Sequence, residues 1–208
     1  LQMDIQNGFL QGSWFPHPIE SIQATLSMKD QTLEFLEWDS IVGGGAVRLD
    51  GTVLTKEFVP ESYDLTVDMR QSRIQLLDWL PPVLGTGDFR VTGEAKLPLI
   101  TGAVEVDEMT FIDRIGWEGA LITFAPAAIA GATEEGAEPY FEYDIDFTAN
   151  KTIRMRNNLA DMTASADLKF VGDMATPGMT GRIDLTENGR VLFKERDFNV
   201  LRGSLRYD

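Results

Sequence analysis

Apolar and polar residues alternate along most of this chain, and this pattern restricts its fold more than any other feature. Tyr143, Ile145 and Phe147 alternate with Asp144 and Asp146, and the same period of two recurs in runs from residue 22 to the end. A strand with one dry face and one wet face has this period. Parallel strands that are covered on both faces are instead apolar at nearly every position. The pattern therefore predicts an all-β protein with a mostly antiparallel sheet.

Glycine-containing sequences separate many of these runs. Glycine, alone or beside aspartate or asparagine, supplies the positive φ that tight connections between strands need. Such sequences predict turns at residues 43–45, 50–51, 85–87 and 188–189.

One segment has the spacing of a helix. Ile74, Leu77 and Leu80 recur every three residues, and two prolines follow directly. Because proline cannot continue a helix, the pattern predicts at most one short helix, near residues 73–80. Residues 125–139 are mostly small or acidic, and they predict an exposed loop.

An internal repeat indicates the architecture. Residues 88–106 read DFRVTGEAKLPLITGAVEV and residues 167–185 read DLKFVGDMATPGMTGRIDL, so that Asp, Gly, Pro, Thr and Gly coincide without a gap. A weaker third copy begins at Gly45. Each unit has one apolar face that it cannot bury alone, so neighbouring units must stack. We therefore predict that residues 1–208 form a single elongated segment, and we interpret it as a fragment of a longer chain.

Composition excludes several classes of function. The chain has 18 Lys and Arg against 33 Asp and Glu, a net charge of −15, whereas proteins that bind nucleic acids need a basic surface. It has no cysteine, which excludes disulfides and thiolate metal sites. We expect no cofactor and no nucleic-acid partner.

Catalytic and metal-binding residues are not evident either. His17 is the only histidine, so no second histidine or cysteine can complete a nucleophilic triad or a zinc site. Asp144 and Asp146, like Glu105 and Asp107, lie two positions apart and share the wet face of a strand. A glycosidase pair or a calcium site could use such carboxylates, but no calcium-loop sequence accompanies them. We interpret them as a solvated face and expect no enzymatic activity.

Two further groups of residues have more than one interpretation. Arg154 and Arg156 are interpreted as surface residues, with contact to a lipid headgroup as the alternative. Phe9, Leu10, Trp14 and Phe15 form an apolar patch near the N-terminus. This patch would either continue an apolar groove or be an exposed sheet edge.

The last fifty residues contain a series of glycine-spaced, apolar motifs. These are Asn157-Asn158-Leu159-Ala160, Pro177-x-x-Thr180-Gly181-x-Ile183-Asp184-Leu185, Gly189-x-Val191-x-Phe193, Phe198-x-Val200 and Arg202-Gly203-x-Leu205-x-Tyr207. In order and spacing these motifs resemble the C-terminal domain of TamB, a component of the translocation and assembly module, in the AsmA-like, repeating-β-groove superfamily. The resemblance extends over residues 85–208, and the first third of the chain shares only the general style of the pattern.

The resemblance implies a fold and a function. It implies a curled sheet that forms a U-shaped groove with an apolar interior. It also implies a non-enzymatic role in conducting phospholipids between the inner and outer membranes, as part of a translocation and assembly module. The full-length chain would be anchored in the inner membrane and span the periplasm of a Gram-negative bacterium. A part of the chain outside this segment would meet an outer-membrane β-barrel of the TamA type.

The predicted groove lining consists of the alternating apolar residues. A closed core and an open groove have the same alternation, so a structural or adhesive β-sandwich or solenoid with a closed core remains the alternative. A polysaccharide-active β-helix enzyme is a third reading, supported only by the acidic strand faces. The predicted lining is Ile22, Leu26, Val47, Leu49, Leu65, Val67, Phe89, Val91, Val104, Val106, Tyr143, Ile145, Phe147, Met162, Leu168, Phe170, Ile183, Leu185, Val191, Phe193, Phe198 and Val200.

Overall fold

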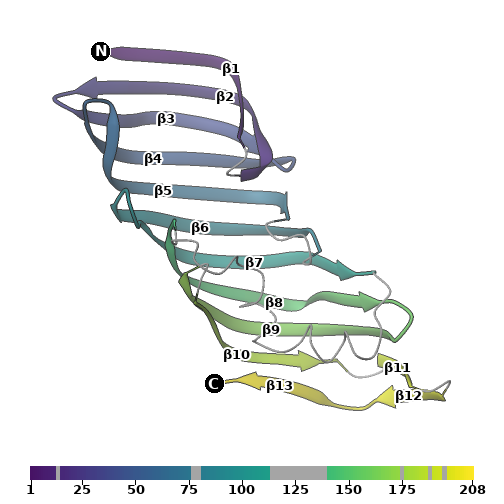
Figure 1. Cartoon of the computed structure of the whole chain (residues 1–208). Helices are drawn as coiled ribbons and strands as arrows, with labels where there is room; N and C mark the ends of the chain where they lie inside the picture. The colour runs from purple at the N-terminus through teal and green to yellow at the C-terminus, as the bar shows by residue number, and fades with distance from the viewer. Residues whose placement is uncertain (13–14, 76–80, 113–139, 174–175, 187–188, 194–195) are drawn as a thin grey trace.

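The described part of the chain forms one thirteen-stranded sheet, and no described residue is helical. Figure 1 shows the strands as a single layer stacked along the chain, with the two termini at opposite ends. The all-β, mostly antiparallel sheet predicted from the alternation is therefore confirmed, and the sheet is open, as the resemblance implied. The computed structural model describes residues 1–12, 15–75, 81–112, 140–173, 176–186, 189–193 and 196–208.

Most strands are long and follow one another directly. The strands are β1 (Gln2–Gly12), β2 (Phe15–Lys29), β3 (Thr32–Val42), β4 (Gly45–Lys56), β5 (Val59–Ile74), β6 (Val83–Glu94), β7 (Leu99–Phe111), β8 (Glu142–Arg156), β9 (Ala160–Asp173), β10 (Pro177–Leu185), β11 (Gly189–Phe193), β12 (Arg196–Val200) and β13 (Gly203–Tyr207).

The strand order follows the chain from β1 to β10, and β13 pairs with β10 at the far edge. All described pairings are antiparallel except that of β7 with β8. That pair is parallel because the chain returns to the starting side of the sheet between the two strands. The β11–β12 hairpin pairs with the start of β9, where Val191 lies opposite Ala160 and Arg190 lies opposite Asp161. The rest of the hairpin extends beyond that strand.

The turns differ in part from the prediction. Gly43 and Gly44 do form a turn with positive φ, but Gly51, Gly85 and Gly87 lie inside β4 and β6. Two tight hairpins instead use non-glycine residues at positive φ, at residues 30–31 and 57–58. Sequence reasoning missed these turns because it searched for glycine, whereas the antiparallel pairing on both sides imposes the turn conformation.

The expected helix does not begin where the spacing predicted. Arg73 and Ile74 form the end of β5, where they pair with β6. Residues 76–80, the rest of the predicted helix, lie outside the described residues, as does the predicted loop at 125–139.

A line of β-bulges crosses the sheet near one end of its strands. Asn7, Ser21, Gln71 and Lys151 have φ between 52° and 59°, and each lies where the register of its strand shifts. A bulge bends its strand and increases the local twist. Figure 1 shows β1 and β2 turning sharply near this line. The bulges therefore bend the sheet across several strands.

The best-buried residues line this bend. Ile22 and Ser72 directly follow bulged residues, and Val106 and Ala149 directly precede register shifts. All four belong to the same face, and Val106 is only 1% exposed. That face is therefore on the concave side of the bend. The buried cluster around Val106 continues through Met109 and Leu168 and their neighbours Ala149 and Ala166.

Ser72 allows a stability test at this bend. Its hydroxyl is fully buried and has no hydrogen-bond partner. A buried polar group without a partner lowers stability by about 1–3 kcal/mol. We therefore expect Ser72→Ala to raise the free energy of unfolding by up to about 1 kcal/mol, measured by urea denaturation. Thr55 is the control, because its buried hydroxyl donates to the carbonyl of Gln31 at 2.8 Å, so Thr55→Val should lower stability. Equal effects of both changes would contradict the assignment.

Candidate functional site

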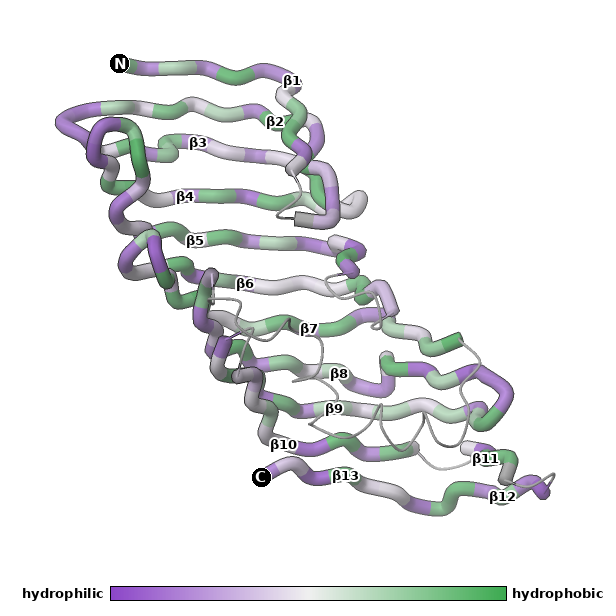
Figure 2. The backbone as a smooth tube through the Cα atoms, in the orientation of Figure 1, coloured by the Kyte–Doolittle hydropathy of each residue, from purple (hydrophilic) through white to green (hydrophobic). Residues whose placement is uncertain are grey.

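One face of the sheet is apolar from β1 to β13. Direct cross-strand partners point to the same side of the sheet, and the register pairs apolar residues with apolar residues. Leu65 pairs with Val91, which pairs with Ile100, which pairs with Tyr143. We call this side the apolar face; Figure 2 shows the matching alternation of apolar and polar residues along the strands. A parallel row on it consists of Leu49, Val67, Phe89, Gly102, Ile145, Phe170 and Met179.

The apolar face is only partly covered. The main contacts between strands join neighbours in the sheet, apart from a minor contact between β3 and β5. No second sheet or helix among the described residues packs on this face. Val91, Phe89 and Ile145 are consequently half-buried although they point to the dry side. A continuous apolar surface of this kind is typical of a binding surface.

The predicted lining residues all belong to strands that contribute to the apolar face, and the register puts their described side chains on it. Ile22, Leu26, Val106 and Leu168 are buried, and Phe198 is 51% exposed. The side chain of Phe193 lies outside the described part of the structure. The other residues of the predicted lining are half-buried. That these residues contact lipid stays a prediction.

Several residues of the apolar face were not included in the predicted lining. Ile100, Met109 and Met179 belong to this face, as do Met69 and Tyr63. Glycine interrupts the alternation of apolar and polar residues, because Gly87, Gly102 and Gly181 occupy apolar-face positions between the larger residues. Counting glycine as a member of the apolar set extends the alternation through these strands.

Aromatic rings lie opposite glycines on the apolar face. Five cross-strand pairs with described side chains join an aromatic residue to a glycine that has φ between 100° and 156°. A ring that covers a strand glycine shields its exposed backbone. At Gly102 the Cδ1 atom of the Phe89 ring lies 3.0 Å from the position that a Cβ would take, so this ring lies close to its paired glycine. The pairs are Phe35 with Gly51, Tyr63 with Gly93, Phe89 with Gly102, Tyr143 with Gly172, and Tyr207 with Gly181.

Two tyrosines of this face have polar groups in a partly dry environment. The hydroxyl of Tyr143 donates to the carbonyl oxygen of Asp173 at 3.2 Å. Burial raises the pKa of Tyr143 and also that of Tyr207. Both tyrosines therefore stay neutral at physiological pH, and they add no charge to the apolar face.

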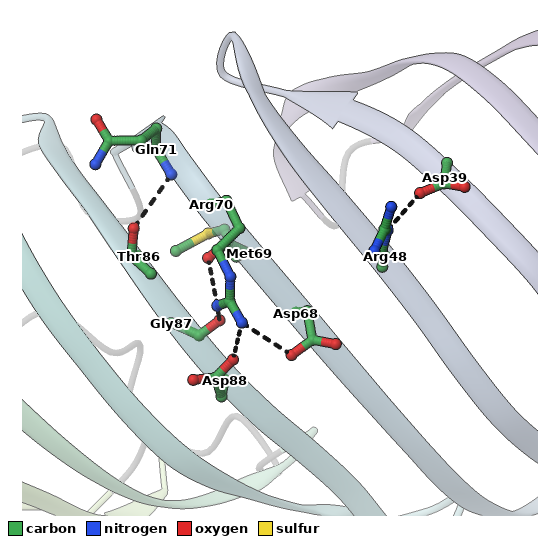
Figure 3. Close-up of polar contacts among 9 residues, drawn as sticks. All are labelled: Asp39, Arg48, Asp68, Met69, Arg70, Gln71, Thr86, Gly87 and Asp88. Atoms are coloured by element: carbon green, nitrogen blue, oxygen red, sulfur yellow. Dashed lines mark hydrogen bonds and ion pairs between the residues drawn. The ribbon is translucent and has the colours of Figure 1, made fainter.

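The opposite face is charged and ion-paired (Figure 3). Arg70 pairs with Asp88 at 2.7 Å and with Asp68 at 3.4 Å, and its guanidinium also donates to the carbonyl of Gly87. Farther along the same face Arg48 pairs with Asp39 at 2.8 Å. These pairs are exposed to solvent, so each contributes little to stability.

Two facing carboxylates in this network influence each other. Asp68 and Asp88 are direct cross-strand partners. The hydrogen bond with Asp88 raises the pKa of Asp68, whereas the hydrogen bond from Arg70 lowers the pKa of Asp88. Arg70 thus compensates for a repulsion between like charges, and the pair has a structural explanation without any catalytic role.

The candidate acidic pairs also have structural partners. Lys169 forms ion pairs with both Asp144 and Asp146 across the β8–β9 pairing. Asp107 accepts a hydrogen bond from the amide of Gln71 at 2.6 Å. Among the described residues, no group of three or more histidine or acidic side chains is arranged to hold a metal ion.

His17 has a structural role as well. Its Nε2 accepts a hydrogen bond from the backbone N–H of Gln75 at 2.8 Å, which joins β2 to the end of β5 past the β3–β4 turn. Arg154 and Arg156 are exposed on the charged face at the end of β8.

Comparison with known proteins gives one match. The TamB C-terminal domain family matches residues 38–208. No curated protein and no solved structure matches the chain. Within the described segments, no helix is long and apolar enough to cross a membrane.

Proposed function

This chain belongs to the TamB C-terminal domain family, a family of the bacterial envelope, and on this premise we propose that it is a non-enzymatic groove that conducts phospholipids. The transport would take place in the periplasm, between the inner and outer membranes. The full-length protein would be anchored in the inner membrane. It would act within the translocation and assembly module, with a TamA-type β-barrel as its partner in the outer membrane.

The observation that carries this proposal is the uncovered apolar face. It extends through the sheet from β1 to β13 without interruption by another layer of described residues. An uncovered apolar surface of this extent is unfavourable in water unless something covers it. Acyl chains are suited to cover it because they are flexible, long and wholly apolar.

The energetics favour acyl chains as the occupant. Each methylene removed from water contributes about 0.8 kcal/mol, so two long chains gain on the order of 20 kcal/mol before the costs of ordering them. A headgroup can stay in water at the open side of the sheet. Transfer along the sheet needs a continuous surface, and rows of similar apolar residues such as Leu65, Val91 and Ile100 provide positions of nearly equal affinity.

The charged face is consistent with the same function. Its ion pairs keep the outside of an open sheet hydrated, and its acidic excess discourages association with other sheets. Arg90 with Asp64 and Lys169 with Asp146 are examples. The apolar face is thus left as the surface that is available to lipid.

A closed-core structural or adhesive domain is the competing function. It would require a second layer over the apolar face, and the described strands provide none. It also predicts a dry interior that takes up no ligand.

Native mass spectrometry of the purified chain, followed by lipid extraction, tests the proposal. We expect additional mass that corresponds to phospholipid and is recovered in the extract. An apo mass that persists after incubation with phospholipid or detergent would contradict the proposal and favour the closed-core domain. A soluble β protein of similar size and acidity, purified in the same way, controls for adventitious lipid.

A further inference from the structure

Charge is distributed unevenly along the elongated sheet. Residues 1–150 contain 8 Lys and Arg against 25 Asp and Glu, whereas residues 151–208 contain 10 against 8. The strongly negative first part repels anionic groups over several ångströms. An anionic headgroup is therefore tolerated best near the C-terminal strands.

Ion pairing differs between the two parts in the same way. All described arginines before residue 151, namely Arg48, Arg70, Arg73 and Arg90, pair with a carboxylate. Beyond residue 150, Arg182 and Arg190 do so. The guanidinium groups that make no ion pair with a described residue are those of Arg154, Arg156, Arg196, Arg202 and Arg206.

Arg196 differs from Arg154, Arg156 and Arg206 because cross-strand pairing assigns it to the apolar face. Ala160 of the apolar face pairs with Val191, and Val191 pairs with Phe198. Arg196 lies two positions before Phe198 on β12, where it pairs with Phe193. Direct cross-strand partners share a face, and residues two apart on one strand do so too. Among the described residues that cross-strand pairing assigns to the apolar face, Arg196 is the only charged one.

The surroundings of Arg196 are amphiphilic. Arg196 is exposed at the tip of the β11–β12 hairpin, beyond the end of β9. Phe198 lies two positions away with 51% of its surface exposed, and the half-buried Val191 and Met162 continue the apolar surface toward β8. A guanidinium beside an apolar surface matches an acyl chain that ends in a phosphate, because its planar donors bind phosphate oxygens in a bidentate way.

We propose that Arg196 binds the phosphate of an anionic phospholipid whose acyl chains lie on the apolar face over Val191 and Met162. This inference rests on the proposed lipid-conducting function and adds the class of headgroup and its position. The lipid enters or leaves the groove at the β11–β12 hairpin with its headgroup held at the rim.

Isothermal titration of the chain with two short-chain lipids below their micellar concentrations tests this proposal. Dioctanoylphosphatidylglycerol carries the phosphate, and dioctanoylglycerol has the same chains without it. We expect Arg196→Gln to weaken binding of the phospholipid about three- to tenfold and to leave binding of dioctanoylglycerol unchanged. In about 1 M salt the unaltered protein and the Arg196→Gln variant should bind the phospholipid nearly equally, because the screening length falls to about 3 Å.

Arg206→Gln is the matched control. Arg206 is exposed, makes no ion pair with a described residue, and lies on the charged face opposite Arg182. Both variants lose one positive charge, so equal weakening by both would indicate an effect of net charge and overturn the proposal. Unchanged phospholipid affinity in Arg196→Gln would also overturn it, as would an equal loss of dioctanoylglycerol affinity. If the unaltered chain binds neither lipid, the proposed function itself fails.

Discussion

Gly181→Ala is expected to lower the free energy of unfolding by roughly 3 kcal/mol or more, one of the largest effects of any single methyl group in this chain. Gly181 has φ of 118° inside β10, a conformation that costs an L-residue energy. An added Cβ would also collide with the carbonyl oxygen of Asp167 and lie 2.9 Å from the Cα of Leu168. Both obstacles are backbone atoms of the neighbouring strand, so no side-chain rotation relieves them.

Gly93→Ala separates conformational strain from this collision. Gly93 has a similar φ of 100°, but a Cβ there would meet nothing within 4 Å. We expect a loss of about 1–2 kcal/mol from strain alone. Urea denaturation followed by circular dichroism measures both variants. Equal losses would show that close packing of β9 on β10 does not restrict this position, in conflict with the register described above.

Val91→Asp is expected to abolish phospholipid capture while the chain remains folded. Val91 is half-buried on the apolar face between Leu65 and Ile100, and it is not part of the buried cluster around Val106. An aspartate there stays partly hydrated, so the cost in stability is about 1–3 kcal/mol. It would interrupt the continuous apolar surface with a charge. Lipid recovered from the purified variant should fall at least tenfold, a change of about 1.4 kcal/mol or more in binding.

Thr180→Asp is the control for this variant. Thr180 is exposed on the charged face opposite Lys169, so the same charge is added away from the apolar face. Its lipid content should match that of the unaltered chain. Phe170 is a less suitable probe than Val91, because its ring packs edge-on against Phe147 and against the buried cluster. Normal lipid capture by Val91→Asp would contradict the groove, and complete unfolding would indicate a sealed core.

The geometry around the glycines and the face on which each charged residue lies were the features that the sequence revealed least well. Gly51, Gly102 and Gly181 have equivalent surroundings, because a Cβ added to any of them would meet backbone atoms of the facing strand. The third repeat copy was expected at Gly45, which lacks the positive φ of this group. Only the register shows that Gly51 has this geometry, because the identity of the facing residue depends on strand pairing. That residues 88–106 and 167–185 form an internal repeat stays a prediction.

Arg196 illustrates a second limit. It follows a lysine and a glutamate and precedes Asp197, so in sequence it resembles any charged turn. Sequence reasoning instead considered Arg154 and Arg156, as surface residues with headgroup contact as the alternative, and these two lie on the charged face. The pairing of β11 with β9 determines which side of the sheet the hairpin presents, and this pairing joins residues about thirty positions apart. Alternation within one strand cannot supply that information.

Period-two alternation was sufficient to establish an antiparallel β protein and to show which side chains share a face. This holds because successive side chains of a strand point to opposite sides, whatever the rest of the fold. Alternation could not distinguish an open sheet from a closed core, since both bury one face of each strand. The distinction rests on the bulges at residues such as Ser21, Gln71 and Lys151, on the strand order, and on the lack of a second described layer. These are relations between distant segments, and they exist only once the strands have paired.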